Sequence, residues 1–218
     1  ADTAHISAIP IQSTRGEPEQ TASPNAEPYA AQSTRNWPRI PAHDGRTGSS
    51  PLSREFRDKI ADKESSGKYN IKNSKGFLGR YQFGKLSLQD AGMKDANGNW
   101  TGKYGVHSEA DFLGNPMAQE RTLVDFLGKL HGLLTFYKAH KQIGTEIQGI
   151  KGTFNISAAG LLAASHRRGA RAVSDYLIHL AGNGRKSDPN NRPNGMSKEK
   201  YLHIETRLRK FANIRLTR

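Results

Sequence analysis

One carboxylate in this sequence has the surroundings of a general acid. Phe56, Ile60 and Glu64 follow one another at four-residue steps, so they share one face of a helix whose apolar stripe ends in a carboxyl group. Gly67 predicts that the helix ends nearby, which places Glu64 in the last turn. Partial burial and the negative end of the helix dipole both disfavour the ionised form and raise the pKa of such a carboxyl group. Glu64 is therefore a candidate proton donor; the alternative is a solvated glutamate at a helix end.

The segment after Glu64 contains residue types that bind sugars. The amide side chains of Asn73 and Gln82 offer donors and acceptors for hydroxyl and N-acetyl groups. The rings of Tyr69 and Tyr81 offer faces on which a sugar can stack, although Tyr81 could equally belong to the core. Several glycines in the same segment allow the backbone to approach a flat ligand closely. The composition favours a glycan-binding site.

These residues also resemble a known catalytic signature. Glu64-Ser65-Ser66-Gly67, an Asn-rich turn and then Gly79-Arg80-Tyr81-Gln82 resemble the lysozyme-like superfamily, particularly its lytic transglycosylases and goose-type lysozymes. The resemblance covers roughly residues 53–180. It implies that Glu64 is the acid and base, that Ser65 supports it, and that Gln82 lies in the glycan cleft.

A third family element is a helix with Ala-Tyr-Asn near the cleft. Residues 161–166 match its Ala-rich beginning, but Ser165-His166 replace Tyr-Asn. His166 is thus a candidate polar contact to a sugar, or only a helix cap.

The resemblance implies an enzyme that degrades peptidoglycan. It would cleave the β-1,4 bond between N-acetylmuramic acid and N-acetylglucosamine, either as a lysozyme (muramidase) finishing with water or as a lytic transglycosylase finishing with the sugar's own 6-hydroxyl. Between Ser65 and Leu78 there is no Asp or Glu, which excludes a second carboxylate from that segment. A water-holding carboxylate could come from farther along, the candidates being Asp90, Asp95, Glu109, Asp111 and Asp125.

The charge balance predicts a polyanionic partner. The formal net charge is +13, and residues 51–218 hold 29 basic against 15 acidic side chains. A bacterial wall with its carboxylates and phosphates fits such a field. We expect no nucleic-acid partner, since no zinc-finger spacing, aromatic RNA-binding box or basic zipper is present. The rival interpretation is a non-catalytic module that binds cell wall or another polyanion.

Neither a metal nor another cofactor is expected. The chain has no cysteine, which excludes disulfides and thiolate zinc sites. Its eight histidines include no His-Glu-x-x-His motif. His131 and His140 are nine residues apart in a helix predicted from Asn115-Pro116 to about residue 140, which would put them on opposite sides.

The elements that must position these residues are mostly helices. Apolar periodicity and capping residues predict a first helix that ends near residue 64 and is capped by Ser50-Pro51 or by Ser53. They predict further helices over residues 85–91, 116–140, 157–166, 173–180 and 197–211, and a turn or small hairpin over residues 95–102. The predicted fold is mainly α, a lysozyme-like domain with one small irregular or β element.

The chain divides near residue 50. Seven of its ten prolines fall in residues 1–51, so residues 1–50 are predicted to be a Pro/Ser/Thr-rich linker or tail, with Trp37 the one large aromatic able to anchor it. Residues 51–218 are predicted to be the lysozyme-like catalytic domain. No transmembrane segment and no signal peptide are visible. A wall substrate implies action in the periplasm or cell wall after secretion or injection, as in an antibacterial protein, and the chain could be part of a larger multidomain protein.

Overall fold

The computed structural model describes residues 37–41, 43 and 49–218, so most of the predicted tail, residues 1–50, lies outside the described residues. The described chain is mainly helical with one small two-stranded sheet, which confirms the prediction of a mainly α fold with one small β element. Its elements are α2 (Arg54–Glu64), α3 (Lys85–Asp90), η1 (Lys103–Gly105), α4 (Glu109–Gly114), α5 (Pro116–Phe136), η2 (Ala139–Gln142), β1 (Glu146–Gly149), β2 (Gly152–Asn155), α6 (Ala158–Arg168), α7 (Ala170–Gly182) and α8 (Lys198–Lys210).

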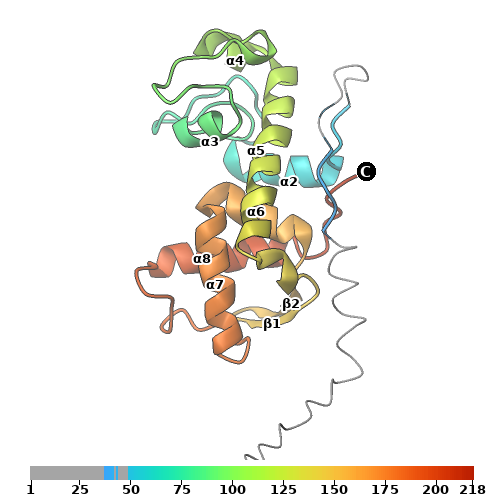
Figure 1. Ribbon diagram of the computed structural model, residues 1–218, viewed down its shortest axis with the longest axis vertical. Coiled ribbons are helices and arrows are strands. Elements are labelled where there is room, and N and C mark those ends of the chain that lie inside the picture. Colours follow the sequence, from blue (N-terminus) through green and yellow to red (C-terminus); the bar gives the residue numbers. More distant parts are fainter. Residues whose placement is uncertain (1–36, 42, 44–48) are drawn as a thin grey trace, which may run out of the picture.

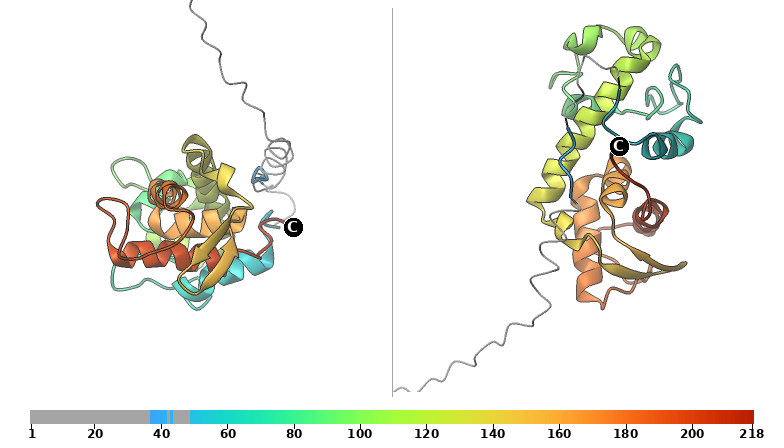
Figure 2. Two further views of the ribbon diagram at one scale, coloured as in Figure 1. Left: turned by 90° about the horizontal axis from the view of Figure 1, so that it is seen from below. Right: turned by 90° about the vertical axis from the view of Figure 1, so that its right-hand side faces the viewer.

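Helix α5 runs along the long axis of the molecule and joins its two ends (Figures 1 and 2). At one end lie α3, α4 and the loops between them; at the other lie α6, α7, α8 and the β1–β2 hairpin. The stripe of α5 that holds the two ends together is made of leucines three or four residues apart, Leu123, Leu127, Leu130 and Leu134, all of which are buried. One amphipathic helix thus organises the core.

Local capping accounts for the starts of the longer helices. The side chain of Ser53 accepts a hydrogen bond from the backbone N–H of Phe56 at 3.1 Å and begins α2. Asn115 caps α5 in the same way, with Pro116 in the first turn. Ser157 and Ser197 cap α6 and α8. These side chains satisfy N–H groups that have no partner inside the helix. The helix starts predicted at Asn115, Ser157 and Ser197 are confirmed, and of the two caps left open for α2 the structure has Ser53.

Two sequence-based expectations are wrong in detail. Helix α5 ends at Phe136 rather than near residue 140, because Lys138 adopts a left-handed backbone conformation (φ 60°). The chain then folds back, and both His131 and His140 stack on the indole of Trp37, with ring centroids 4.2 Å and 6.1 Å away. The prediction that these histidines lie on opposite sides of one helix fails for this reason.

The sheet also lies elsewhere than expected. Residues 146–155 form the hairpin, with Ile147 opposite Phe154 and a tight connection between Gly149 and Gly152. The predicted turn over residues 95–102 is present, but it contributes only an isolated bridge between Lys94 and Trp100.

Helix α6 is the most deeply buried helix segment described. Its residues from Ala158 to Ser165 are all buried. Gly160 faces the backbone of α8 so closely that a Cβ atom there would lie 3.0 Å from the carbonyl oxygen of Leu208. Small residues therefore let α6 and α8 pack tightly, as its Ala-rich sequence predicts.

The two ends of the described chain are fastened to the domain. Trp37 is buried on α5, and its indole N–H donates a hydrogen bond to Thr135 Oγ1 at 2.9 Å. At the other end, Thr217 next to the C-terminus forms a β-bridge with Leu52, which lies just before α2 (Figure 1). Among the described residues, no helix combines the length and apolarity needed to cross a lipid bilayer.

Candidate functional site

The predicted general acid stands at the end of α2. Glu64 is the last residue of that helix, and its side chain lies outside what the structure describes. The next residue, Ser65, is buried, and its hydroxyl donates a hydrogen bond to the carbonyl oxygen of Arg80 at 2.6 Å. This bond joins the end of α2 to the segment that leads to Gln82. The resemblance assigns Ser65 a role in supporting Glu64, and that role stays a prediction.

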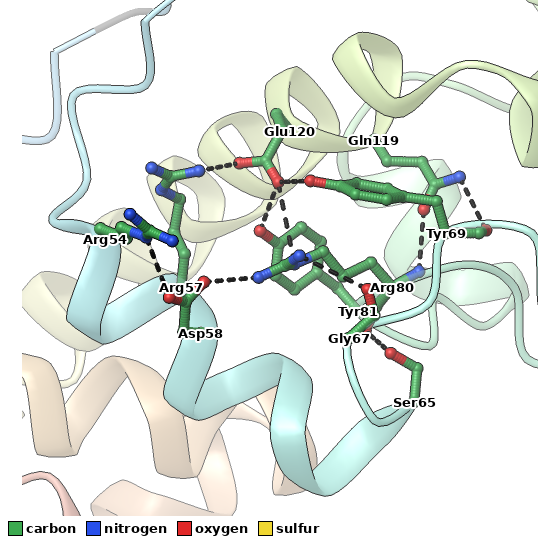
Figure 3. Close-up of polar contacts among 10 residues, drawn as sticks. All are labelled: Arg54, Arg57, Asp58, Ser65, Gly67, Tyr69, Arg80, Tyr81, Gln119 and Glu120. Atoms are coloured by element: carbon green, nitrogen blue, oxygen red, sulfur yellow. Dashed lines mark hydrogen bonds and ion pairs between the residues drawn. The ribbon is translucent and has the colours of Figure 1, made fainter.

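A buried carboxylate of α5, Glu120, holds the same segment from the other side (Figure 3). The hydroxyls of Tyr69 and Tyr81 donate to Glu120 Oε1 at 2.7 Å and 2.6 Å, and Arg57 Nη1 lies 2.8 Å from Oε2. Only 8% of Glu120 is exposed. Because its partners come from α2 and from the loop after it, this carboxylate ties both to α5.

Arg80 adds a second set of links around Glu120. Its guanidinium pairs with Asp58 of α2 at 2.6 Å and lies over the ring of Tyr69, 5.1 Å from the centroid (Figure 3). Its backbone N–H donates to Gln119 Oε1 at 2.8 Å. We call Arg57, Asp58, Tyr69, Arg80, Tyr81, Gln119 and Glu120 the Glu120 cluster. It fixes the backbone between Ser65 and Gln82 at several points.

The tyrosines of the Glu120 cluster are donors at any physiological pH. Burial, followed by the hydrogen bond to Glu120 and its charge, raises the pKa of Tyr69 to about 12. The same causes raise the pKa of Tyr81 above its ordinary value. Both phenols therefore keep their protons, and neither is poised for acid–base chemistry.

Two of the sequence-predicted sugar contacts have structural tasks. Tyr81 has no exposed surface, so its ring belongs to the core, the alternative left open by the sequence. Asn73 Oδ1 accepts hydrogen bonds from the backbone N–H groups of Lys75 and Phe77 at 2.9 Å and 3.0 Å. Asn73 therefore shapes the turn that carries Phe77 toward the pocket described next.

A pocket of about 600 Å³ opens between the two ends of the molecule. It lies where the 75–77 turn, the start of α3, the middle of α5 and the α6–α7 junction meet. Its apolar lining includes Phe77, Phe126, Leu130 and Leu133. The volume falls in the range of small-molecule sites, and residues distant in sequence build it.

Gln82 contributes a polar group to this pocket that has no partner. Its Nε2 donates to the carbonyl oxygen of Gly79 at 2.9 Å, while Oε1 is buried and accepts no hydrogen bond within the described part of the chain. Gln82 also has a left-handed backbone (φ 51°), which is unusual for a residue other than glycine. Buried polar atoms are normally paired, so an orphan acceptor at a pocket wall favours ligand binding.

His166 stands on the same pocket wall. Its ring packs edge-on against Phe83 and Phe126, and neither ring nitrogen has a hydrogen-bond partner among the described residues. Burial, helped by the charges of Arg207 and Arg167, lowers the pKa of His166 to about 3. The ring is therefore neutral, with one donor and one acceptor nitrogen, and can bind a hydroxyl or an amide. His166 does not cap α6, whose caps are Ser157 and Gly169. The polar contact to a sugar, the other role expected of His166, stays a prediction.

The structure brings two of the predicted site residues, Gln82 and His166, to one pocket. Ser65 is hydrogen-bonded to the chain segment that contains Gln82. Tyr69 and Tyr81 belong to the Glu120 cluster instead. Sequence reasoning missed Glu120. Glu120 precedes Leu123 and Leu127 at helical spacing, so it is a carboxylate on an apolar stripe, the same signal that selected Glu64.

No group of three or more metal-ligating side chains is found among the residues that the structure describes. Comparisons of the chain with protein-family models, curated proteins and solved structures returned no match.

Proposed function

We propose that this chain degrades peptidoglycan, cleaving the β-1,4 bond between N-acetylmuramic acid and N-acetylglucosamine with Glu64 as the general acid. The observation that carries the proposal is the pocket wall, where Gln82 Oε1 and both ring nitrogens of His166 are buried without partners. A glycan strand would supply the missing partners through its hydroxyl and N-acetyl groups. The proposed site of action is the periplasm or cell wall.

The placement of Glu64 at the end of α2 supports its proposed role. Ser65 bonds to Arg80, two residues before Gln82, so the end of α2 and the pocket wall are held by one short stretch of chain. The helix dipole at this end disfavours a negative charge, which helps a carboxyl group to keep its proton until it gives it to the leaving oxygen.

The first test is the variant Glu64→Gln, assayed by loss of turbidity in a suspension of purified cell walls. The amide preserves shape but cannot donate a proton, and general acid catalysis is typically worth ~10²–10⁴-fold, so we expect nearly complete loss of cleavage. Glu55→Gln, an exposed glutamate on the same helix, is the matched control. More than about a tenth of the activity in the folded Glu64→Gln protein would exclude Glu64 as the acid.

The ending of the reaction depends on whether a second carboxylate takes part. Of the five candidates, four are engaged away from the pocket: Asp95 with Asn99, Glu109 with Lys72, Asp111 with the N–H of His107, and Asp125 with Tyr104 and Lys103. Asp90 alone of the five is in the pocket lining. It is therefore the carboxylate to test.

We expect Asp90→Asn to retain much more activity than Glu64→Gln, because the proposed reaction can finish on the substrate's own N-acetyl and 6-hydroxyl groups. Mass spectrometry of the released fragments would then show an anhydro sugar, one water lighter than a reducing end. A folded Asp90→Asn protein as inactive as Glu64→Gln, with reducing ends in the wild-type products, would instead identify Asp90 as the partner that holds water. Wall binding without any cleavage by the wild type would favour the non-catalytic module.

A further inference from the structure

Residues 37–41, which we call the strap, run beside α5 (blue in Figure 2). Trp37 contacts His131 and Thr135 on that helix. At about 100° per residue, these two positions lie roughly opposite Leu133, which lines the pocket. The strap therefore lies on the face of α5 that is turned away from the pocket, and the proposed function makes no use of it.

The indole of Trp37 is the main contact of the strap. It lies nearly parallel to the ring of His131, with the centroids 4.2 Å apart and 6° between the planes, and the ring of His140 stacks 6.1 Å away. Its N–H donates a hydrogen bond to Thr135 Oγ1 at 2.9 Å, and only 9% of Trp37 is exposed. Two histidine rings and one hydroxyl, all from α5 and the η2 turn that follows it, thus hold the tryptophan.

The rest of the strap is loosely attached. Arg39 and Pro41 are exposed, and Ile40 is only partly buried. A pocket of about 510 Å³ lies between these residues and α5, where Gly128 has no side chain to fill the space. The burial of one indole must therefore offset the conformational entropy that the whole strap loses when it is ordered. Such a segment can open locally while the rest of the domain stays folded.

The two histidines are poorly placed to carry a proton while Trp37 is docked. His131 Nε2 and His140 Nδ1 are buried, and neither atom has a hydrogen-bond partner within the described ranges. Burial lowers the pKa of His131 below its ordinary value of 6.5; a hydrogen bond to the backbone of Pro38 acts the other way, and the charges of His140 and Arg39 lower it further. A proton on this pair thus costs more in the docked state than in water.

The other charged groups nearby do not offset this cost. The chain beside His140 carries Lys138 and Lys141, both of which are exposed. Asp125, the carboxylate in the pocket beside the strap, is already paired with Lys103 at 2.8 Å. One more histidine, His43, follows the strap two positions after its end. The surroundings of the two stacked rings are therefore mostly positive.

We infer that the strap is an acid-released latch: uncharged His131 and His140 hold Trp37 against α5, and a proton on this pair releases it. A released His131 is solvated and takes up a proton at its ordinary pKa, so lowering the pH favours the released chain. Release moves the attachment of the preceding residues from Trp37 toward Leu52, which stays bridged to Thr217. The latch would thus set how far the N-terminal part of the chain reaches from the domain.

The sign and size of the effect follow from His131. Its contribution to docking is fully present above pH 6.5, the ordinary pKa of histidine, and is lost as the pH falls from there toward the lowered pKa of the docked state. Within that window, each pH unit should reduce the ratio of docked to released chains by up to about tenfold.

Tryptophan fluorescence measures the release directly. The chain has two tryptophans, so Trp100→Phe leaves Trp37 as the one tryptophan emitter in the full chain. We expect acrylamide to quench Trp37 more strongly, and its emission to move to longer wavelength, as the pH falls from about 7.5 to about 5, while the far-UV circular dichroism stays constant. Acrylamide quenching is measured rather than intensity, because a charged imidazole beside an indole quenches its emission without any release.

His131→Phe, made in the Trp100→Phe chain, tests whether His131 is the switch. Phenylalanine keeps a ring that can stack on the indole but takes up no proton, so Trp37 should stay shielded from acrylamide throughout the pH range. His203→Phe makes the same replacement at a histidine of α8 whose side chain is about half exposed, and it should release the strap as the parent chain does. His43→Gln should also leave the release unchanged.

Three outcomes would overturn the inference: equal shielding of Trp37 at every pH in the parent chain, exposure of Trp37 only together with loss of the circular dichroism signal, and release in His131→Phe as in the parent. If His131→Phe exposes Trp37 already at pH 7.5, His140→Phe becomes the test. It should respond to pH less steeply than the parent, and an unchanged response would count against the latch in the same way. None of these measurements uses wall cleavage, so failure of the proposed function would appear separately.

Discussion

His166 combines two properties that define the chemistry of the pocket at the scale of single residues. Its ring nitrogens are buried without partners, and it is surrounded by Phe83, Phe126 and two arginine charges. Such surroundings keep the ring neutral, so His166 offers hydrogen bonds but no proton shuttle near neutral pH. Glu64 remains the one proton donor that the proposed mechanism needs.

The neutrality of His166 predicts how stability depends on pH. The pKa of His166 is lowered to about 3 in the folded chain, against an ordinary value of 6.5 for histidine. The contribution of the neutral His166 ring to the free energy of unfolding is therefore fully present above pH 6.5. It is lost as the pH falls toward 3, because the unfolded state takes up the proton first. The free energy of unfolding of the wild type should fall relative to that of His166→Gln by up to about 1.4 kcal/mol per pH unit between pH 6 and pH 4.

Urea unfolding at pH 7, 6, 5 and 4 measures this difference. His203→Gln, which removes an exposed histidine, is the control and should give a curve close to the wild type. Parallel curves for the wild type and His166→Gln would show that His166 takes up its proton equally easily in both states.

At the scale of secondary-structure elements, local sequence signals predicted the helices. They did not predict the contacts between residues that are far apart in the sequence. The caps at Ser53 and Asn115 act within three residues, so the sequence around them is sufficient to place the helix starts. The hydrogen bonds to Glu120 join residues that are 39 to 63 positions apart. Nothing in the local sequence of α5 shows which tyrosine or arginine will meet Glu120.

The same contrast explains the wrong end of α5. Apolar periodicity continues past Phe136 to Tyr137, so the pattern alone favours a longer helix. The packing of Trp37 against His131 and His140 accompanies the return of the chain at Lys138. That contact joins segments about a hundred positions apart in the chain, as its hydrogen bond to Thr135 shows, and no local pattern records it.

The Glu120 cluster predicts a large cost for removing its carboxylate. Glu120→Ala leaves Arg57, Tyr69 and Tyr81 without their common acceptor in a buried place, and breaking a buried ion pair in this way typically costs about 3–5 kcal/mol. Glu120→Gln keeps an oxygen for the tyrosine hydroxyls and should cost less. We expect urea unfolding to rank the two variants in that order.

Glu109→Gln is the matched control, because its ion pair with Lys72 is about half exposed on both sides. Exposed pairs contribute about 1 kcal/mol or less. If Glu120→Ala were no less stable than Glu109→Gln, the Glu120 cluster would not be holding the loop between α2 and Gln82.

The whole molecule places its pocket between two ends that share α5, and three cations and one carboxylate line that pocket. The helices at one end supply His166 and the N-terminus of α7, while the loops and the start of α3 at the other supply Gln82, Lys75 and Lys85. A long anionic polymer could therefore meet both the pocket and the surrounding positive surface. The pocket would select the sugar, and the field would hold the strand.

This division of tasks predicts that wall binding depends on salt. The net charge of +13 acts over a Debye length of about 10 Å at 0.1 M salt, which shrinks to about 3 Å at 1 M. Sedimentation of the non-cleaving Glu64→Gln variant with purified walls measures binding alone, and the bound fraction should fall steeply across that range. Chitin, a neutral glycan, is the control and should bind with little dependence on salt. Wall binding that stays constant to 1 M salt, with the chain folded throughout, would mean that contacts inside the pocket supply the affinity and that the surface charge has another purpose.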